Sequence, residues 1–148
     1  MTQEPYEQQH TLRRPARIEG VGLHTGRAAR VEFKPAPADS GIAFVRTDLP
    51  GTPPIGASAA NILHADRRPR RTSVGNGTVE VHTIEHLMAS CFGLGLDNLL
   101  VEISAEEVPW ELIEQRKIPA VRYTMNPGPM AQQIALAAGR LEMADVAG

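Results

Sequence analysis

Apolar residues recur at helical spacing in the middle of the chain. From Ile84 they fall at i, i+3, i+4, i+7 and i+8, which is the pattern of an amphipathic helix with one face toward a core. Thr83 is well placed to cap the first turn, and Gly93 is a suitable residue to end the helix after roughly three turns. The predicted apolar face consists of Ile84, Leu87, Met88, Cys91 and Phe92. The side chains predicted to lie off this face are His82, Glu85, His86 and Ala89.

Shorter segments on both sides of this helix have the composition of strands. Residues 27–34 end in strand-like alternation, residues 98–103 are apolar and β-branched, and segments rich in proline and glycine separate several of the others. Asn76-Gly77 is a strong signal for a hairpin turn that leads the chain into the helix. These elements predict an α+β fold, a two-layer sandwich of a mainly antiparallel sheet with a helix packed on one face. The segments predicted as strands are residues 27–34, 42–46, 72–74, 78–81 and 98–103.

Length, charge and cysteine content narrow the class of protein. The 148 residues are enough for one domain with a modest core, and a net charge of −2 gives no reason to expect a nucleic-acid partner. The polar start has no secretory signal pattern, and no apolar run approaches the ~20 residues of a transmembrane segment. Cys91, the single cysteine, falls on the predicted apolar face, which favours a small buried side chain over a nucleophile or disulfide partner. We expect a soluble, cytoplasmic protein.

Two imidazoles and a carboxylate stand close together at the start of the predicted helix. The spacing His82-x-x-Glu85-His86 matches the inverzincin peptidase signature, in which both histidines bind zinc and the glutamate is the general base. A catalytic zinc generally needs three protein ligands and an open position for water, and one helix does not supply them all. The same residues also fit the solvated polar face of an ordinary helix. This short pattern alone leaves both interpretations open.

Six motifs in a fixed order extend the pattern over most of the chain. They are TLRR at 11–14, IEGVGLHTG at 18–26, GIAFVRTDL at 41–49, RTSVG at 71–75, TIEHL at 83–87 and GLGLDN at 93–98. In order and spacing they resemble the amino-terminal domain of the UDP-3-O-acyl-N-acetylglucosamine deacetylases. The resemblance divides the chain into a polar leader at 1–10, a deacetylase-like domain at 11–109 and a divergent tail of unknown role at 110–148. The family fold, one α+β sandwich per domain, agrees with the fold predicted above.

The resemblance implies a zinc-dependent amidohydrolase that removes acetate from an acylated UDP-N-acetylglucosamine, the committed step of lipid A biosynthesis. Matched to the family motif residue by residue, His86 is a zinc ligand and Glu85 is the general acid/base acting on the zinc-bound water. These roles agree with the chemistry of a metal-bound water beside a carboxylate. His82 is not a ligand in this interpretation, and we expect it to be a polar residue at the entry of the helix.

Three further residues lie in segments that the family places near its active site. His24 is part of a glycine-containing motif that permits tight turning, so it either contacts substrate or has a structural role. The hydroxyls of Thr72 and Ser73 either bind substrate or cap a loop. The other two histidines, His10 and His64, are expected at the surface.

The chain departs from the family pattern after Pro109. The family is expected to continue into an Asp-Gly-Ser stretch and a second domain, which supplies a histidine and an aspartate to zinc together with another catalytic histidine. No histidine follows His86 in this sequence. The tail from Trp110 has weaker patterns, among them a helix-prone segment at 130–143. We therefore expect an incomplete, or half, enzyme.

Three hypotheses follow from these observations. In the first, the chain contributes His86 and Glu85 to deacetylation together with a complementing second domain or with another copy in a homo-oligomer. In the second, it is a catalytically inactive module that keeps nucleotide-sugar or protein contacts. In the third, it is a small inverzincin-type peptidase that uses His82 and His86 as zinc ligands.

Overall fold

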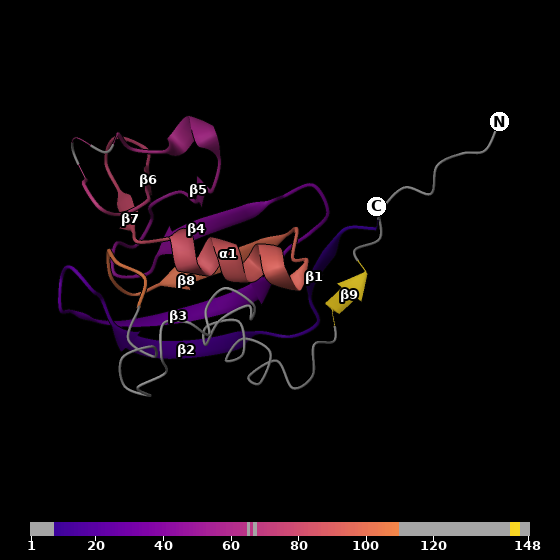
Figure 1. Cartoon of the computed structure of the whole chain (residues 1–148). Coiled ribbons are helices and arrows are strands. Elements are labelled where there is room, and N and C mark those ends of the chain that lie inside the picture. Colours follow the sequence, from indigo (N-terminus) through magenta and orange to yellow (C-terminus); the bar gives the residue numbers. More distant parts are fainter. Residues whose placement is uncertain (1–7, 65, 67, 110–142, 146–148) are drawn as a thin grey trace, which may run out of the picture.

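The computed structural model describes residues 8–64, 66, 68–109 and 143–145. Its elements follow one another in the order of the chain, from the first short strand to a strand close to the carboxyl end (Figure 1). They are β1 (His10–Leu12), β2 (Ala16–Val21), β3 (Ala28–Pro35), β4 (Ile42–Arg46), β5 (Ile55–Gly56), the 3-10 helix η1 (Ala59–Asn61), β6 (Ser73–Gly75), β7 (Glu80–His82), α1 (Glu85–Leu94), β8 (Leu99–Ile103) and β9 (Met143–Asp145).

A five-stranded sheet with the order β2-β3-β8-β4-β5 is the largest unit of the fold. Neighbouring strands are antiparallel, except that β4 and β8 run parallel. Helix α1 lies across one face of this sheet (Figure 1). Two smaller antiparallel pairs, β1-β9 and β6-β7, complete the described part of the chain. The predicted α+β sandwich of a mainly antiparallel sheet and a helix is confirmed.

Alternate residues of the central strands point into the core between sheet and helix. Val31 and Phe33 on β3 and Val101 on β8 have no exposed surface, while their neighbours along each strand are partly or fully exposed. Leu87 and Cys91 of α1 pack against the same cluster. Burial alternates from one residue to the next because successive side chains of a strand point to opposite faces of the sheet, and only one face is covered.

The outer face of the sheet carries ion pairs across the strands. The register sets Arg17 opposite Glu32 and Glu19 opposite Arg30. The side chains of these pairs approach to 3.4 Å and 2.8 Å. Such exposed pairs contribute little stability, so the sheet is stabilised mainly by the apolar face beneath them.

The hairpin before the helix is confirmed. β6 and β7 pair with Val74 opposite Val81, and Gly77 adopts a φ of 93°. The Asn76 Oδ1 accepts hydrogen bonds from the main-chain N–H groups of Thr78 and Val79 at 3.0 and 2.9 Å. The side chain of Asn76 therefore closes the turn, while Gly77 supplies the left-handed conformation that favours glycine.

Both predicted ends of the helix were wrong. Thr83 does not cap α1, because its backbone has a φ of 59° and its hydroxyl is engaged by Glu107 instead. Gly93 lies inside the helix, whose last residue is Leu94 and whose cap residue is Gly95. Gly95 has a φ of 71°, and the N–H of Leu96 bonds to the carbonyl of Cys91 at 2.9 Å. That is the hydrogen bond of a Schellman-type ending.

The predicted apolar face of the helix was right for Leu87 and Cys91 and wrong for Phe92. Leu87 and Cys91 are buried, whereas 88% of Phe92 is exposed. Phe92 lies about 100° around the helix axis from Cys91 and about 140° from Leu87, so it points away from the sheet. Ser90, which was not part of the predicted apolar face, is buried instead. Burial also raises the pKa of the Cys91 thiol to about 12, as expected of an inert buried cysteine.

The predicted helix at 130–143 lies outside the described residues except for Met143, which belongs to β9. In the part of the chain that is described, helices are too short and insufficiently apolar to cross a membrane. The cytoplasmic location stays a prediction, as does the division of the chain at residues 10 and 110.

Candidate active site

Glu85 is the first residue of α1 and is held from outside the helix. Its Oε2 accepts a hydrogen bond from the main-chain N–H of Thr72 at 3.0 Å. In return, the N–H of Ile84 donates to the carbonyl of Thr72 at 3.1 Å. This pair of bonds fastens the start of the helix to the segment that enters β6. The structure thus brings Thr72 and Glu85 together, through the main chain of Thr72.

His86 follows in the same helical turn and is partly buried. Its main-chain carbonyl accepts a hydrogen bond from the Ser90 hydroxyl at 2.7 Å. Consecutive helical side chains project about 100° apart, so His86 and Glu85 can serve neighbouring atoms without competing for one position. A carboxylate beside an imidazole suits proton transfer next to a metal-bound group.

His82 was expected to be a polar residue at the entry of the helix, and this expectation was wrong. It ends strand β7, and only 5% of its surface is exposed. Its Nδ1 is hydrogen-bonded to the Ser73 Oγ at 2.8 Å, and its Nε2 lies 3.3 Å from the Glu80 Oε2. Burial, reinforced by the nearby Arg71 guanidinium, lowers the pKa of His82 despite the carboxylate of Glu80. The ring is therefore a buried group of the hairpin, and its lowered pKa favours the neutral form at neutral pH.

The position of His82 on a strand argues against the peptidase hypothesis. His82 belongs to a strand and His86 to a helix, so the two imidazoles do not share the helical face that the signature requires. Ser73, which bonds to His82, is itself 1% exposed. Its hydroxyl has an internal partner in this structure, and substrate contact by Ser73 stays a prediction.

His24 lies in an exposed loop between β2 and β3, whose main chain is anchored to a distant residue. The N–H groups of His24 and Thr25 donate to the Glu107 Oε1 at 2.8 and 2.9 Å. Within the loop, the N–H of Gly26 donates to the Gly22 carbonyl at 3.0 Å. The imidazole itself is exposed, so a role of His24 in substrate contact stays a prediction. His64 is exposed as predicted, whereas His10 is only partly exposed.

Glu107 is the residue near this site that the sequence analysis missed. It is 1% exposed, although its side chain carries a carboxylate. Burial opposes its ionisation, but hydrogen bonds from Thr83, Thr25 and His24 outweigh that cost and hold the pKa of Glu107 below its ordinary value. The sequence offered one indication, a glutamate between the apolar β8 and Val108-Pro109, but no pattern that identified its partners.

The described residues do not by themselves fit a complete catalytic zinc site. Among residues 8–64, 66, 68–109 and 143–145, no group of three or more histidine, cysteine, aspartate or glutamate side chains is arranged to hold a metal. A catalytic zinc takes three protein ligands, and His86 with Glu85 accounts for fewer.

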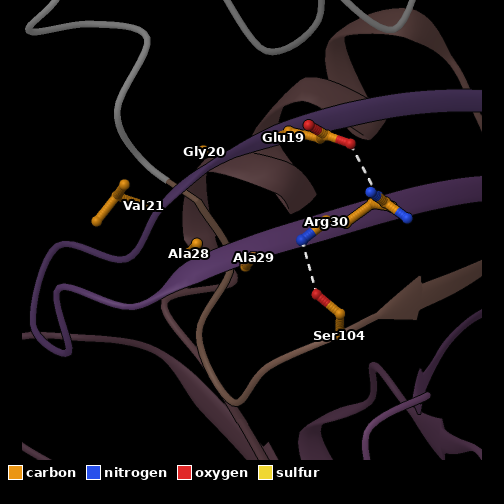
Figure 2. Close-up of a pocket in the computed structure, with 7 residues that line it drawn as sticks. All are labelled: Glu19, Gly20, Val21, Ala28, Ala29, Arg30 and Ser104. Atoms are coloured by element: carbon orange, nitrogen blue, oxygen red, sulfur yellow. Dashed lines mark hydrogen bonds and ion pairs between the residues drawn. The ribbon is translucent and has the colours of Figure 1, made fainter.

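A separate pocket of about 520 Å³ opens beside the end of β2 and the start of β3. Figure 2 shows the ion pair between Glu19 and Arg30 and the hydrogen bond from the Arg30 N–H to the Ser104 Oγ, 2.8 Å long, on its wall. None of the predicted site residues lines this pocket. It belongs to the outer, charged face of the sheet and not to the candidate site.

Comparisons with known proteins identify the family. The family model described as LpxC, UDP-3-O-acyl N-acetylglycosamine deacetylase, matches residues 9–111. The chain is 46% identical over 101 residues to the UDP-3-O-acyl-N-acetylglucosamine deacetylase of Teredinibacter turnerae, and 38% identical over 101 residues to that of Bdellovibrio bacteriovorus. Each match covers 68% of this chain and 32% of the relative, so the chain spans about a third of the relatives' length. The chain therefore belongs to the UDP-3-O-acyl-N-acetylglucosamine deacetylase family.

Proposed function

We propose that this chain contributes the Glu85 and His86 part of a zinc-dependent active site that deacetylates an acylated UDP-N-acetylglucosamine. The observation that carries this proposal is the bond from the Thr72 N–H to the Glu85 Oε2 at 3.0 Å, which holds a carboxylate next to His86. The family membership and the names of the relatives support the reaction and the substrate class. His86 acts as one zinc ligand, and the remaining ligands come from outside the described residues.

Glu85 moves the proton in this proposal. With one carboxylate oxygen held by Thr72, the other accepts a proton from the water that attacks the acetamide carbonyl. The C–N bond then breaks, and Glu85 returns the proton to the departing amine. The products are acetate and a free amino sugar nucleotide, so atoms and protons balance. Fixing the carboxylate in advance reduces the entropy lost on reaching the transition state.

Zinc titration of the purified chain tests the assignment of His86. We expect weak binding in the wild type, because few donors converge, and a further loss in His86→Ala. His82→Ala is the matched control and is expected to leave zinc affinity unchanged, since that imidazole is bonded to Ser73. Equal loss in both variants would instead support the peptidase hypothesis and contradict the proposal.

Deacetylation tests the rest of the proposal. The chain is assayed alone and together with the separately produced two thirds of the Teredinibacter turnerae relative that the match does not cover. We expect release of acetate only in the mixture, and a loss of about 10²–10⁴-fold in Glu85→Gln. The exposed His64→Ala is the control and should retain full activity. Binding of the UDP-sugar without turnover in the mixture would indicate the inactive binding module instead.

A further inference from the structure

Glu107 joins three segments that are far apart in the sequence. The segment around it runs beside the end of β7, where the His82 N–H donates to the Glu106 carbonyl at 2.7 Å and the Val108 N–H donates to the His82 carbonyl at 3.1 Å. Its side chain reaches from there to the loop between β2 and β3. The main chain of residues 106–108 is therefore held by hydrogen bonds that do not involve the Glu107 carboxylate.

The carboxylate accepts hydrogen bonds on both oxygens. Oε1 accepts from the N–H groups of His24 and Thr25 at 2.8 and 2.9 Å, and from the Thr25 hydroxyl at 3.2 Å. Oε2 accepts from the Thr83 hydroxyl. Bonds to an ionised acceptor are roughly twice as strong as neutral ones, and a buried carboxylate needs several of them. One side chain thus holds together the His24 loop, residues 22–27 between β2 and β3, and the Thr83 turn, residues 83–84 between β7 and α1.

The Thr83 turn sets the start of the helix. Its φ of 59° is unfavourable for a β-branched residue, so the surrounding contacts must maintain it. The bond to Glu107 is such a contact, and the next residue, Ile84, donates to Thr72 at 3.1 Å. Glu85 and His86 follow immediately. A shift of Thr83 would therefore move the two residues of the candidate site.

The other end of the connection is equally restricted. A Cβ added to Gly22 would lie 2.3 Å from the Glu107 Oε1 and 2.6 Å from the Thr25 Oγ1. Only glycine permits the loop backbone to approach the carboxylate this closely. The loop that carries His24 is thus shaped around Glu107.

We propose that Glu107 is a positioning residue, which fixes the His24 loop and the Thr83 turn against each other and so sets Glu85 and His86 relative to His24. The catalytic relevance of this positioning rests on the proposed function, whereas the hydrogen bonds of Glu107 do not depend on it. The test reads hydrogen bonds in the absence of substrate and zinc. A chain without deacetylase activity would therefore leave the result unaffected.

Amide hydrogen exchange of the isotope-labelled full chain is the measurement. Glu107→Ala should accelerate exchange at His24 and Thr25 at least about tenfold, because each loses a charged acceptor. The N–H groups of Thr72 and Ile84 donate to the Glu85 carboxylate and the Thr72 carbonyl at the start of the helix. Their exchange should also accelerate several-fold. Amides of the central strands β3 and β8 should keep their wild-type rates and serve as the internal reference.

Two matched variants make the test specific. Glu107→Gln keeps the size and one carbonyl acceptor, and its amide can donate to the Thr83 hydroxyl, so its acceleration should be smaller than that of Glu107→Ala. Glu106→Ala removes the neighbouring carboxylate, which pairs with Arg27 at 3.4 Å, and should change neither set of amides.

Three results would overturn the proposal. Acceleration confined to His24 and Thr25 would make Glu107 a loop anchor without influence on the helix start. A uniform acceleration of all amides in both Glu107 variants would make it a general stabiliser. The same pattern in Glu106→Ala would show that the segment, and not the carboxylate, fixes the turn.

Discussion

The five-stranded sheet and the turn before helix α1 are stabilised by different kinds of buried group. The fully buried side chains of β3 and β8 are apolar, Phe33 and Val101 among them. Around the turn, apolar residues such as Val81 and Ile84 are buried together with four polar residues, each of which has a specific partner. These polar residues are Ser73, His82, Thr83 and Glu107.

This difference separates stability from geometry. Apolar burial is roughly proportional to area and has no preferred direction, so the sheet tolerates replacements that keep volume and apolar character. A buried hydrogen bond fixes two atoms at one distance and costs free energy when either partner is removed. We infer that the sheet supplies most of the free energy of folding, while the turn fixes the position of Glu85 and His86.

The largest effect is expected in the sheet. Phe33→Ala should lower the free energy of unfolding by about 3–5 kcal/mol, because it removes a fully buried ring and leaves a cavity. Urea unfolding at neutral pH measures the change. Phe33→Leu is the milder variant and should lose less while keeping the wild-type exchange rates of His24 and Thr25. A loss in Phe33→Ala no greater than in Phe33→Leu would contradict the central place of this ring in the core.

A smaller effect is expected at the turn. Thr83→Val keeps the branched shape but removes the hydroxyl that donates to Glu107, so it should cost about 1–3 kcal/mol. Thr83→Ser keeps the hydroxyl and should cost less than the valine variant. The same urea unfolding experiment ranks the three proteins. A valine variant as stable as the wild type would mean that the hydrogen bond, and with it the anchoring of the turn, contributes nothing.

Acid should weaken the turn in two stages, with a smaller change than either substitution. The pKa of His82 is lowered from 6.5, chiefly by burial, so its contribution is complete above pH 6.5 and is lost as the pH falls below that value. The pKa of Glu107 lies below its ordinary 4.5, so its contribution is lost only as the pH falls from 4.5 through the folded-state pKa.

Urea unfolding across this pH range separates the two stages by comparison with single variants. His82→Gln should lack the decline that begins near pH 6.5, and Glu107→Gln should lack the decline below pH 4.5. Wild-type and His82→Gln curves that stay parallel from neutral pH to pH 4.5 would show that the imidazole is already free to protonate in the folded chain.

The sequence was most informative where structure depends on neighbouring residues. The apolar and β-branched composition of residues 42–46 and 98–103 predicted β4 and β8, and Asn76-Gly77 predicted the hairpin, because each pattern is complete within a few positions. The parallel pairing of β4 with β8 depends on how the chain returns, and no local pattern encodes it. The strand β2 was also not predicted, although its motif was recognised.

Within the candidate site, the sequence pointed to Glu85 and His86, whose catalytic roles stay a prediction, but not to the residues that hold them in place. Glu85 and His86 followed from a motif. The role of Glu107 depends instead on contacts with His24 and Thr25, which precede it by 83 and 82 positions in the sequence. Thr83 misled the prediction because threonine usually caps a helix through its own hydroxyl. Here that hydroxyl serves the distant carboxylate, and the backbone adopts the left-handed conformation instead.

The smallest effect is expected on the outer side of α1, where the sequence pattern was wrong. Phe92 is 88% exposed, so Phe92→Ser should change the free energy of unfolding by less than about 0.5 kcal/mol. Its buried neighbour gives the matched control, since Cys91→Ser places a hydroxyl in an apolar environment and should cost about 1–3 kcal/mol. Equal losses in the two variants would place Phe92 in a contact with the rest of the chain, and the helix would then have two packed sides instead of one.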